Sequence, residues 1–311
     1  MSKTIKIGTR DSELALWQAH TVEKKLNDLG YQTEIISVKS TGDIILDKPL
    51  YELGITGIFT KTLDIAMLKG EVDIAVHSMK DVPTALPKGI VQAAVLERAS
   101  TLDILVHKGD LSFLENSGTI PITIGTGSLR RKAQWLNKYP SHQVEDLRGN
   151  VNTRMQKLKD NNWNGAVFAA AGLERINLKP ETFINLDWMI PAPAQGAMVV
   201  VAMENDTFSQ EALAHLNHKE SEICTFVERQ FLKTLEGGCT APIGALATID
   251  KNQLTLKGVL FSLDGKEKLV IEKTINSSLF QKFGELCATE ILENGGSELM
   301  RIIKTALNQK H

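Results

Sequence analysis

A cysteine on a glycine-rich loop is the first residue of this chain whose type and setting suggest chemistry. Cys239 follows two glycines and stands three residues before Pro242. Glycine adopts backbone angles closed to other residues, and proline disfavours helix and central strand, so this spacing predicts a tight loop. A thiol there could do chemistry or be inert, because its reactivity depends on its pKa. Cys224 and Cys287 fall within helical patterns and are interpreted as small buried hydrophobes.

A second candidate site follows an apolar run. Residues 72–76 are nearly all apolar, which predicts a buried strand. The run leads into His77, Ser78, Lys80 and Asp81. Active sites of open α/β sheets lie at the carboxyl ends of the strands, so these polar groups are well placed for catalysis. Asp81 could instead cap a turn by accepting backbone N–H groups.

Arginines recur where predicted strands run into predicted helices. Arginine suits carboxylates because its planar fork makes two parallel hydrogen bonds, and helix starts themselves favour anions. Any single one could be a solvated surface residue. Six at equivalent places predict a cleft for a molecule bearing many carboxylates or phosphates. The six are Arg10, Arg130, Arg131, Arg148, Arg154 and Arg175.

The composition is that of an ordinary globular protein, and the length of 311 residues suggests two or three domains. The net charge of -2 argues against a broad nucleic-acid-binding surface. Three widely spaced cysteines predict neither a disulfide framework nor a zinc site, and they fit a reduced cytoplasmic setting. The chain enters a strand pattern at residue 4, which leaves no room for a signal peptide. No apolar run approaches membrane-spanning length.

The elements that must position these residues alternate between strand and helix. A strand at 4–8, a helix from about residue 12 to 29 and a strand at 31–38 predict a β-α-β opening, and hence an α/β protein with parallel or mixed sheets. Residues 40–59 predict a long loop, a length typical of lids. The proline-rich residues 190–197 predict a crossing between domains. Three strands and two helices near the C-terminus predict a small α+β unit. Neither a P-loop nor a dinucleotide-binding glycine motif is present.

Eight ordered stretches of this chain resemble motifs of the porphobilinogen deaminase family, also called hydroxymethylbilane synthases. They are TRDSELALWQAH (9–20), STGDIILDKPL (40–50), DIAVHSMKDVP (73–83), IGTGSLRRKAQ (124–134), LRGNVNTR (147–154), AAAGLERI (169–176), PAPAQGA (191–197) and LEGGCTAPIG (235–244). The stretches run nearly end to end, so the resemblance is specific. It implies a transferase of tetrapyrrole and heme biosynthesis.

The resemblance also implies an architecture. Two lobes with mixed sheets, similar to those of type II periplasmic binding proteins, would be joined by a small C-terminal α+β domain. The implied domains are residues 1–98 with 195–217, residues 99–194, and residues 218–311. A cytoplasmic monomer is expected, with the small molecule porphobilinogen as substrate and with no nucleic acid, membrane or metal partner.

The family's functional residues carry over by motif position. Cys239 matches the cysteine that binds the dipyrromethane cofactor through a thioether, and Asp81 matches the catalytic aspartate. The family adds four porphobilinogen molecules to this primer with loss of ammonia, and water then releases the linear tetrapyrrole. Further positions that match cofactor-binding residues are Lys80, Thr126, Ser128, Arg130, Arg131 and Arg148. Positions that match substrate-binding residues are Arg10, Ser12, Gln18, Arg148, Arg154 and Arg175.

The chain departs from the family pattern in the predicted lid and in three other motifs. Thr56, preceded by Ile55, stands where the family commonly has a lid lysine, although Lys61 lies nearby. Gly127 replaces a serine, Pro193-Ala194 replaces Val-Gly, and Thr240-Ala241 replaces Gln-Val. None of these changes removes a residue assigned to chemistry, so an active enzyme is expected.

Two other readings of the same residues remain open at this point. A non-catalytic bilobal protein that binds polycarboxylates would explain the arginines, but neither Asp81 beside Lys80 nor the Cys239 loop. A nucleic-acid or phosphate binder could use Arg130, Arg131 and the following lysine, but the acidic balance of the chain counts against it.

Overall fold

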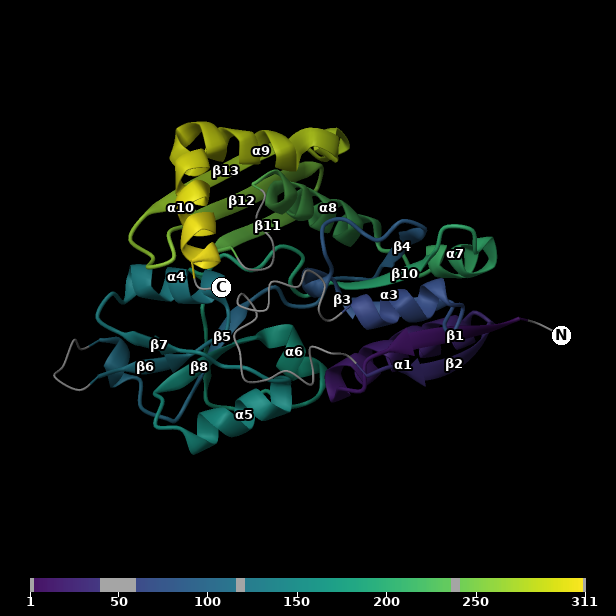
Figure 1. The fold of residues 1–311 in the computed structure, drawn as a ribbon, viewed down its shortest axis with the longest axis horizontal. Coiled ribbons are helices and arrows are strands. Elements are labelled where there is room, and N and C mark those ends of the chain that lie inside the picture. The colour runs from purple at the N-terminus through teal and green to yellow at the C-terminus, as the bar shows by residue number, and fades with distance from the viewer. Residues whose placement is uncertain (1–2, 40–59, 116–120, 236–240, 310–311) are drawn as a thin grey trace.

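The computed structural model describes residues 3–39, 60–115, 121–235 and 241–309. In this part of the chain the strands form three sheets, each packed against helices (Figure 1). The two sheets of five strands lie side by side, and the C-terminal sheet of three strands lies above them in the view of Figure 1. The expected fold class, α/β with a small C-terminal α+β unit, is confirmed.

The first sheet has the strand order β2-β1-β3-β10-β4. β1, β2 and β3 are parallel, while β10 is antiparallel to β3 and β4. Helices α1 and α7 cover one face and α3 covers the other, which explains the nearly continuous apolar sequence of β3. The bounds are β1 (Thr4–Thr9), α1 (Glu13–Asp28), β2 (Gln32–Ser37), α3 (Lys61–Leu68), β3 (Ile74–Ser78), β4 (Ile90–Val95), β10 (Met198–Met203) and α7 (Thr207–Ala214).

The second sheet, β7-β6-β8-β5-β9, repeats this plan. β6, β7 and β8 are parallel, and β5 is antiparallel to both β8 and β9. Helices α5 and α6 cover one face, and α4 covers the other with the buried Trp135. The bounds are β5 (Asp103–His107), β6 (Thr123–Gly125), α4 (Leu129–Lys138), β7 (Gln143–Glu145), α5 (Val151–Asp160), β8 (Gly165–Ala169), α6 (Ala170–Arg175) and β9 (Phe183–Asn185). A short helical turn, η3 (Ser112–Leu114), follows β5.

Two crossing segments join these sheets. Residues 96–102 lead from β4 to β5, and residues 186–197 lead from β9 back to β10, as the proline-rich stretch predicted. The crossings touch at Gly196, whose φ of 86° favours glycine. A Cβ on Gly196 would lie 2.6 Å from the carbonyl oxygen of Ala99, so no larger residue fits there without a backbone shift.

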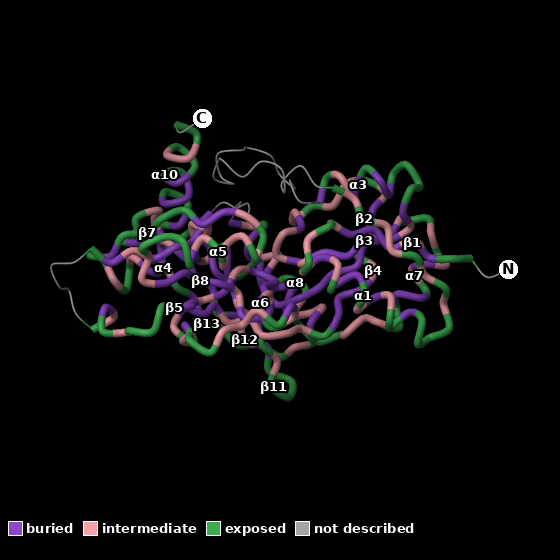
Figure 2. Tube along the Cα trace, turned by 90° about the horizontal axis from the view of Figure 1, so that it is seen from below, coloured by how far each residue is buried: buried purple, intermediate pink, exposed green. Residues whose placement is uncertain are grey.

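The C-terminal unit is an antiparallel meander, β11-β12-β13, with a helical layer on it. Its core includes Phe231 of α8 and Leu256 of β12, both fully buried. Figure 2 shows buried backbone along the central strands of the two larger sheets, such as β3 and β8, while the outer strand β13 is mostly exposed. The bounds are α8 (Lys219–Thr234), β11 (Ile243–Asp250), β12 (Gln253–Phe261), β13 (Lys268–Asn276), η4 (Ser277–Lys282), α9 (Phe283–Ile291), η5 (Leu292–Gly296) and α10 (Ser297–Asn308).

Some elements differ from the sequence predictions. β4 and β9 were not predicted, because β4 lacks a clear alternation and β9 has only three residues. β3 extends through His77 and Ser78, which were expected to follow the strand. Arg175 ends helix α6 and does not stand at its start. Strands β4 and β9 are additions to the predicted order, while the other differences move element boundaries.

Candidate active site

A cavity of about 460 Å³ lies between the first two sheets, at the carboxyl ends of β1, β3 and β8. Five of the six predicted arginines line it, together with Lys80 and Asp81. The lining residues come from the start of α1, the turn after β3, the end of β8, helices α4, α5 and α6, the turn before α5, and the second crossing segment. The five arginines are Arg10, Arg131, Arg148, Arg154 and Arg175. The sequence therefore predicted one shared cleft, and the structure brings these side chains together.

The turn that carries Asp81 is fixed by backbone contacts. Met79, Lys80 and Asp81 form the helical turn η2, directly after β3. Met79 N donates to the carbonyl oxygen of Ala197 at 3.0 Å, and Val82 N donates to that of Met79 at 3.2 Å. Among the described residues, the Asp81 carboxylate accepts no hydrogen bond from a backbone N–H. The turn-cap reading of Asp81 thus has no support in this region.

An arginine that sequence reasoning missed also holds this turn. Arg229 of α8 donates from Nη1 to the carbonyl oxygen of Val82 at 2.9 Å and from Nη2 to that of Pro83 at 2.6 Å. A helix of the C-terminal unit therefore anchors the segment that presents Asp81 to the cavity. The sequence did carry a signal for this role, because Arg229 is a charged residue in a helix that has a buried apolar face.

Burial and mutual repulsion shape the charges around the cavity. Burial lowers the pKa of Arg154 to about 10, and the positive charges of Arg131, Arg148 and Arg10 act in the same direction. Asp81 opposes this shift. The part of the shift that comes from the other arginines requires that these charges lie near one another in a medium that screens them poorly. The arginines of the two sheets therefore act on one another as a single cluster.

Lys80 is the cation of this cluster whose pKa comes nearest to neutral pH. Burial lowers its pKa to about 8, and the neighbouring Asp81 raises it. Lys80 therefore carries a positive charge below about pH 8 and loses it above. Burial similarly lowers the pKa of Arg175 to about 10, so this guanidinium remains charged at neutral pH.

Arg130 is placed differently from its neighbour Arg131. Arg130 is 4% exposed, and its Nη1 donates to Asp103 Oδ2 at 2.7 Å and to the carbonyl oxygen of Ile190 at 2.8 Å. It does not line the cavity. Arg131 also contacts Asp103, but it reaches the cavity wall. The two adjacent arginines, which the sequence treated alike, thus occupy different environments.

Three other predicted residues lie beside the main cavity rather than in its wall. Ser128 caps helix α4 by accepting from Arg131 N, and Thr126 Oγ1 accepts from Ser128 N at 3.3 Å. Both hydroxyls therefore have a structural partner within the turn. Gln18 donates to Ser78 Oγ at 2.8 Å and lines a smaller cavity of about 60 Å³, which Asp81 also borders.

Ser12 serves both structure and site. It caps helix α1 by accepting from Ala15 N, and it lines both cavities. His77 borders the smaller cavity, where burial and then Arg10 lower its pKa to about 4. His77 is therefore neutral at neutral pH and does not supply a charged acid there.

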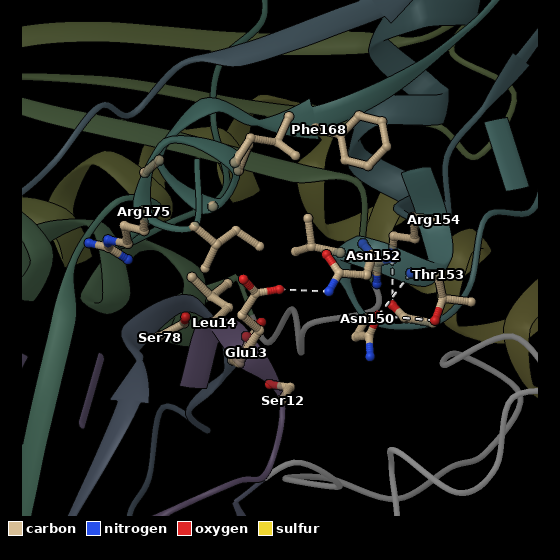
Figure 3. Close-up of a pocket in the computed structure, with 18 of the residues that line it drawn as sticks. Ser12, Glu13, Leu14, Ser78, Asn150, Asn152, Thr153, Arg154, Phe168 and Arg175 are labelled. Carbon is tan, nitrogen blue, oxygen red and sulfur yellow. Dashed lines mark hydrogen bonds between the residues drawn. The ribbon is translucent and has the colours of Figure 1, made fainter. Parts of the chain in front are cut away.

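Contacts between the two lobes close one side of the cavity. Asn152 Nδ2 donates to Glu13 Oε2 at 2.7 Å, which joins α5 to α1 across the opening (Figure 3). Arg175 lies over the ring of Trp17, with 5.6 Å between the guanidinium carbon and the ring centroid. Arg175 also donates to the carbonyl oxygen of Gly196 at 2.7 Å. Sequence reasoning missed Glu13 and Asn152, since exposed polar residues near helix starts carry no specific signal.

Several predicted features lie outside the described residues. They are Cys239 with its two glycines, and the predicted lid with Ile55 and Thr56. In the sequence, the cysteine stretch stands between the residues of α8 and those of β11. Cys224 and Cys287 are buried, and burial raises the pKa of their thiols to about 12 and about 11. Their interpretation as small buried hydrophobes is confirmed.

Comparison with known proteins identifies the family. A model described as "Porphobilinogen deaminase, dipyromethane cofactor binding domain" matches residues 5–211, and one described as "Porphobilinogen deaminase, C-terminal domain" matches residues 222–293. The chain belongs to the porphobilinogen deaminase family. The first match contains every residue that lines the main cavity. The expected family, its transferase activity in tetrapyrrole biosynthesis and its dipyrromethane cofactor are thereby confirmed, against a non-catalytic binding protein.

Full-length relatives agree with this assignment. The chain is 40% identical to a porphobilinogen deaminase of Desulfitobacterium hafniense over 312 residues, which covers 98% of this chain and 99% of the relative. It is 45% identical to a probable porphobilinogen deaminase of Methanocaldococcus jannaschii over 255 residues, 81% of this chain and 86% of the relative. The solved structure of a methionine-binding protein, MetQ, superposes with a TM-score of 0.43 at 13% identity over 68% of this chain and 89% of that one. This score is too low to bear on the fold. No helix among the described residues is long and apolar enough to cross a membrane.

Proposed function

We propose that this porphobilinogen deaminase performs its reaction in the cavity of about 460 Å³, with Asp81 as the catalytic carboxylate and the surrounding cations as carboxylate-binding groups. The observation that carries the proposal is the convergence of five predicted arginines, Lys80 and Asp81 on this one cavity. The product is the linear hydroxymethylbilane, made from four porphobilinogen molecules by deamination and closing hydrolysis.

The lining residues suit a dipyrromethane with its acetate and propionate arms. Six basic and three acidic side chains line the cavity in the described part of the chain, a surplus of three positive charges. When bound, the dipyrromethane supplies the free pyrrole α-carbon to which each unit is added. Arg131, Arg148 and Lys80 would hold its carboxylates, since guanidinium forks bind carboxylates in two places. Cys239 would carry it through a thioether.

Asp81 acts on the substrate. When ammonia leaves the aminomethyl arm of porphobilinogen, positive charge develops on the pyrrole ring. A fixed carboxylate beside this ring stabilises the charge, and it can accept the proton that later leaves. Because the turn Met79–Asp81 is anchored at Ala197 and Arg229, the carboxylate is held before the charge appears. Preorganisation of this kind avoids a reorganisation cost in the transition state.

The remaining cations neutralise the substrate. Arg10, Arg154 and Arg175 would bind the acetate and propionate groups of incoming porphobilinogen, with Ser12 and Gln18 as hydrogen-bond partners beside Asp81. Each added ring brings two further carboxylates, so one cavity needs several guanidiniums. Lys80 gives a compact charge that is present below about pH 8. Thr126 and Ser128 would contribute through the helix start that they build.

We also propose a division into three domains, at residues 1–98 with 195–217, 99–194 and 218–311. The division is supported by the sheets, since each unit would contain one of them. A cytoplasmic monomer without nucleic-acid or membrane partners is proposed as well. The near-neutral net charge of -2 and the two buried thiols support it.

Cys239→Ser tests the cofactor assignment. We expect the wild-type protein to have a mass above that of its sequence by two linked pyrrole units, and this excess to be lost in the variant together with porphobilinogen consumption. Intact-mass spectrometry measures both proteins after preincubation with porphobilinogen. Cys287→Ala is the matched control and should keep the excess, because that thiol is buried in the core. A wild-type mass equal to the bare sequence would refute covalent attachment, and an excess retained by Cys239→Ser would move it elsewhere.

Arg148→Lys tests the forked recognition of carboxylates. We expect kcat/KM to fall about tenfold although the positive charge is kept, because lysine cannot make two parallel hydrogen bonds. Arg148 is 7% exposed, so water cannot readily replace the hydrogen bond that lysine fails to make. Arg301→Lys, on the exposed face of α10, provides the same exchange away from the cavity. Kinetics equal to wild type would place Arg148 outside the carboxylate site.

A further inference from the structure

A buried carboxylate stands directly behind the arginines of the cavity. Asp103, the first residue of β5, has no exposed surface. Its Oδ1 accepts from Arg131 Nε at 3.0 Å and lies 2.8 Å from Arg131 Nη2, while its Oδ2 accepts from Arg130 Nη1 at 2.7 Å. Burial alone would raise the pKa of Asp103, but the two guanidiniums outweigh burial and hold this pKa well below its usual range. The carboxylate is therefore charged at neutral pH.

The two arginines differ in the N–H groups that these contacts leave for binding a ligand. A guanidinium has five N–H groups. Arg131 donates from Nε to Asp103 and from Nη1 to the carbonyl oxygen of Val167 at 2.9 Å, and its Nη2 pairs with Asp103 at 2.8 Å. At least one N–H on each terminal nitrogen remains, and Arg131 lines the cavity. Arg130 turns Nη1 toward Asp103 and the carbonyl of Ile190, and it lines neither cavity beside Asp81.

We propose that Asp103 is a positioning residue of this enzyme. It holds Arg131 by one edge so that the opposite edge is presented to a carboxylate in the cavity, and it takes Arg130 as its structural partner. The inference rests on the proposed function, which makes this cavity a carboxylate site. A free arginine side chain loses rotational entropy on binding, whereas a fork that is already held has lost it beforehand. One carboxylate between two guanidiniums also leaves one net positive charge beside the cavity.

Gln195 fixes Asp103 to the crossing segments. Its Nε2 donates to Asp103 Oδ1 at 3.0 Å and to the carbonyl oxygen of Thr101 at 2.8 Å. Gln195 has no exposed surface, and its Oε1 has no hydrogen-bond partner in the described part of the chain. Exchange for methionine would remove the donor and this unsatisfied oxygen at nearly constant volume, so the fold should tolerate it. Gln195→Met thus offers a milder way to loosen Asp103.

The charge of Asp103 also acts on Lys80. Asp81 and Asp103 raise the pKa of Lys80, while Arg131 and Arg130 lower it. Removing the charge of Asp103 leaves both arginines in place and takes away one of the two groups that favour the protonated lysine. Lys80 should then lose its proton at a lower pH than in the wild type. This shift provides a readout that loss of packing alone would not produce.

The test is steady-state kinetics of the Asp103→Asn holoenzyme, with porphobilinogen as the variable substrate. Asparagine keeps the shape of the side chain, but it can no longer accept from both arginines. We expect KM to rise about tenfold or more, as for loss of a hydrogen bond to a charged group, with a smaller change in kcat. The alkaline limb of the kcat/KM profile should move to lower pH. Asp110→Asn, an exposed carboxylate that follows the same strand, is the matched control.

A double variant separates positioning from general disturbance. In an Arg131→Met background, Asp103→Asn should raise KM little further, because its effect is exerted through Arg131. Fully additive effects, or an unchanged KM and alkaline limb in folded Asp103→Asn, would overturn the proposal. If Asp103→Asn is insoluble, Gln195→Met replaces it: a smaller rise in KM supports the proposal and a wild-type KM overturns it. Failure of the proposed function is distinguishable, because the wild type would then not consume porphobilinogen.

Discussion

Asp81→Asn is expected to lower kcat by about 10²- to 10³-fold and to leave the fold and the KM for porphobilinogen nearly unchanged. The magnitude is that found when one preorganised electrostatic group is removed from a transition state. Asparagine keeps the size of the side chain but carries no negative charge, so it cannot stabilise the cation formed when ammonia leaves. The turn itself is held by backbone contacts and by Arg229, and these remain in the variant. Porphobilinogen consumption with product identification measures the effect.

The matched control for this variant is Asp28→Asn. Asp28 is a 63% exposed carboxylate in the same lobe, paired with Lys24 at the end of helix α1. It should show wild-type kinetics, since its charge lies on the solvent side of the helix. Circular dichroism and intact mass establish that both variants are folded and loaded with cofactor. A kcat of Asp81→Asn within about threefold of wild type, well short of the loss expected from such a group, would remove this residue from the mechanism.

Glu228→Ala should have the largest effect on stability, lowering the free energy of unfolding by about 3–5 kcal/mol. Glu228 has no exposed surface and pairs through both oxygens with Arg98, at 2.7 and 2.9 Å. It also accepts from the backbone N–H groups of Ala194 at 2.6 Å and Ala247 at 2.7 Å. Alanine would leave a buried guanidinium without its counter-charge and two N–H groups without an acceptor. Denaturant unfolding measures the loss.

Glu298→Ala provides the comparison for this variant. Glu298 also pairs with an arginine, Arg301, but both side chains are largely exposed on helix α10. Water and salt screen such pairs, so its removal should leave the unfolding midpoint essentially unchanged. Because Glu228 joins α8 and β11 to both crossing segments, its loss should also make residues 96–102 easier to cleave in limited proteolysis. Equal midpoints for both variants would show that the Glu228 contacts contribute no net stability.

The difference between Arg130 and Arg131 could not be predicted from the sequence. Both stand in the first turn of one helix, and their types are identical, so only their surroundings separate them. The difference comes from Asp103, which contacts both side chains, whereas only Arg131 lies at the cavity wall. A signal for Asp103 existed: an acidic residue opens an otherwise apolar strand, where an unpaired charge would be costly. Because a buried charge without a partner is costly, this acidic residue predicts a basic partner, and the arginines are the candidates.

Glu228 and Arg229 carried a similar signal. Glu228 is buried and Arg229 is partly buried, next to Val227 and Phe231, which are fully buried. Charged residues at such positions need partners, yet the sequence does not say which ones. The charged or carbonyl partners include Arg98 and the turn that carries Asp81, both more than 30 residues away in the chain. Helical periodicity identifies the face of a helix but not the element that packs against it.

The sequence by itself determined the order of most strands and helices, the family and the set of residues able to hold carboxylates, because periodicity and ordered motifs are local properties of the chain. The tertiary structure alone decided which of these residues share a cavity, and that two sheets without any recognisable sequence repeat follow one plan. It also decided that buried Asp103 and Glu228 stand behind the site. The physical reason is that burial and charge pairing depend on contacts between distant segments, which exist only once the chain has folded.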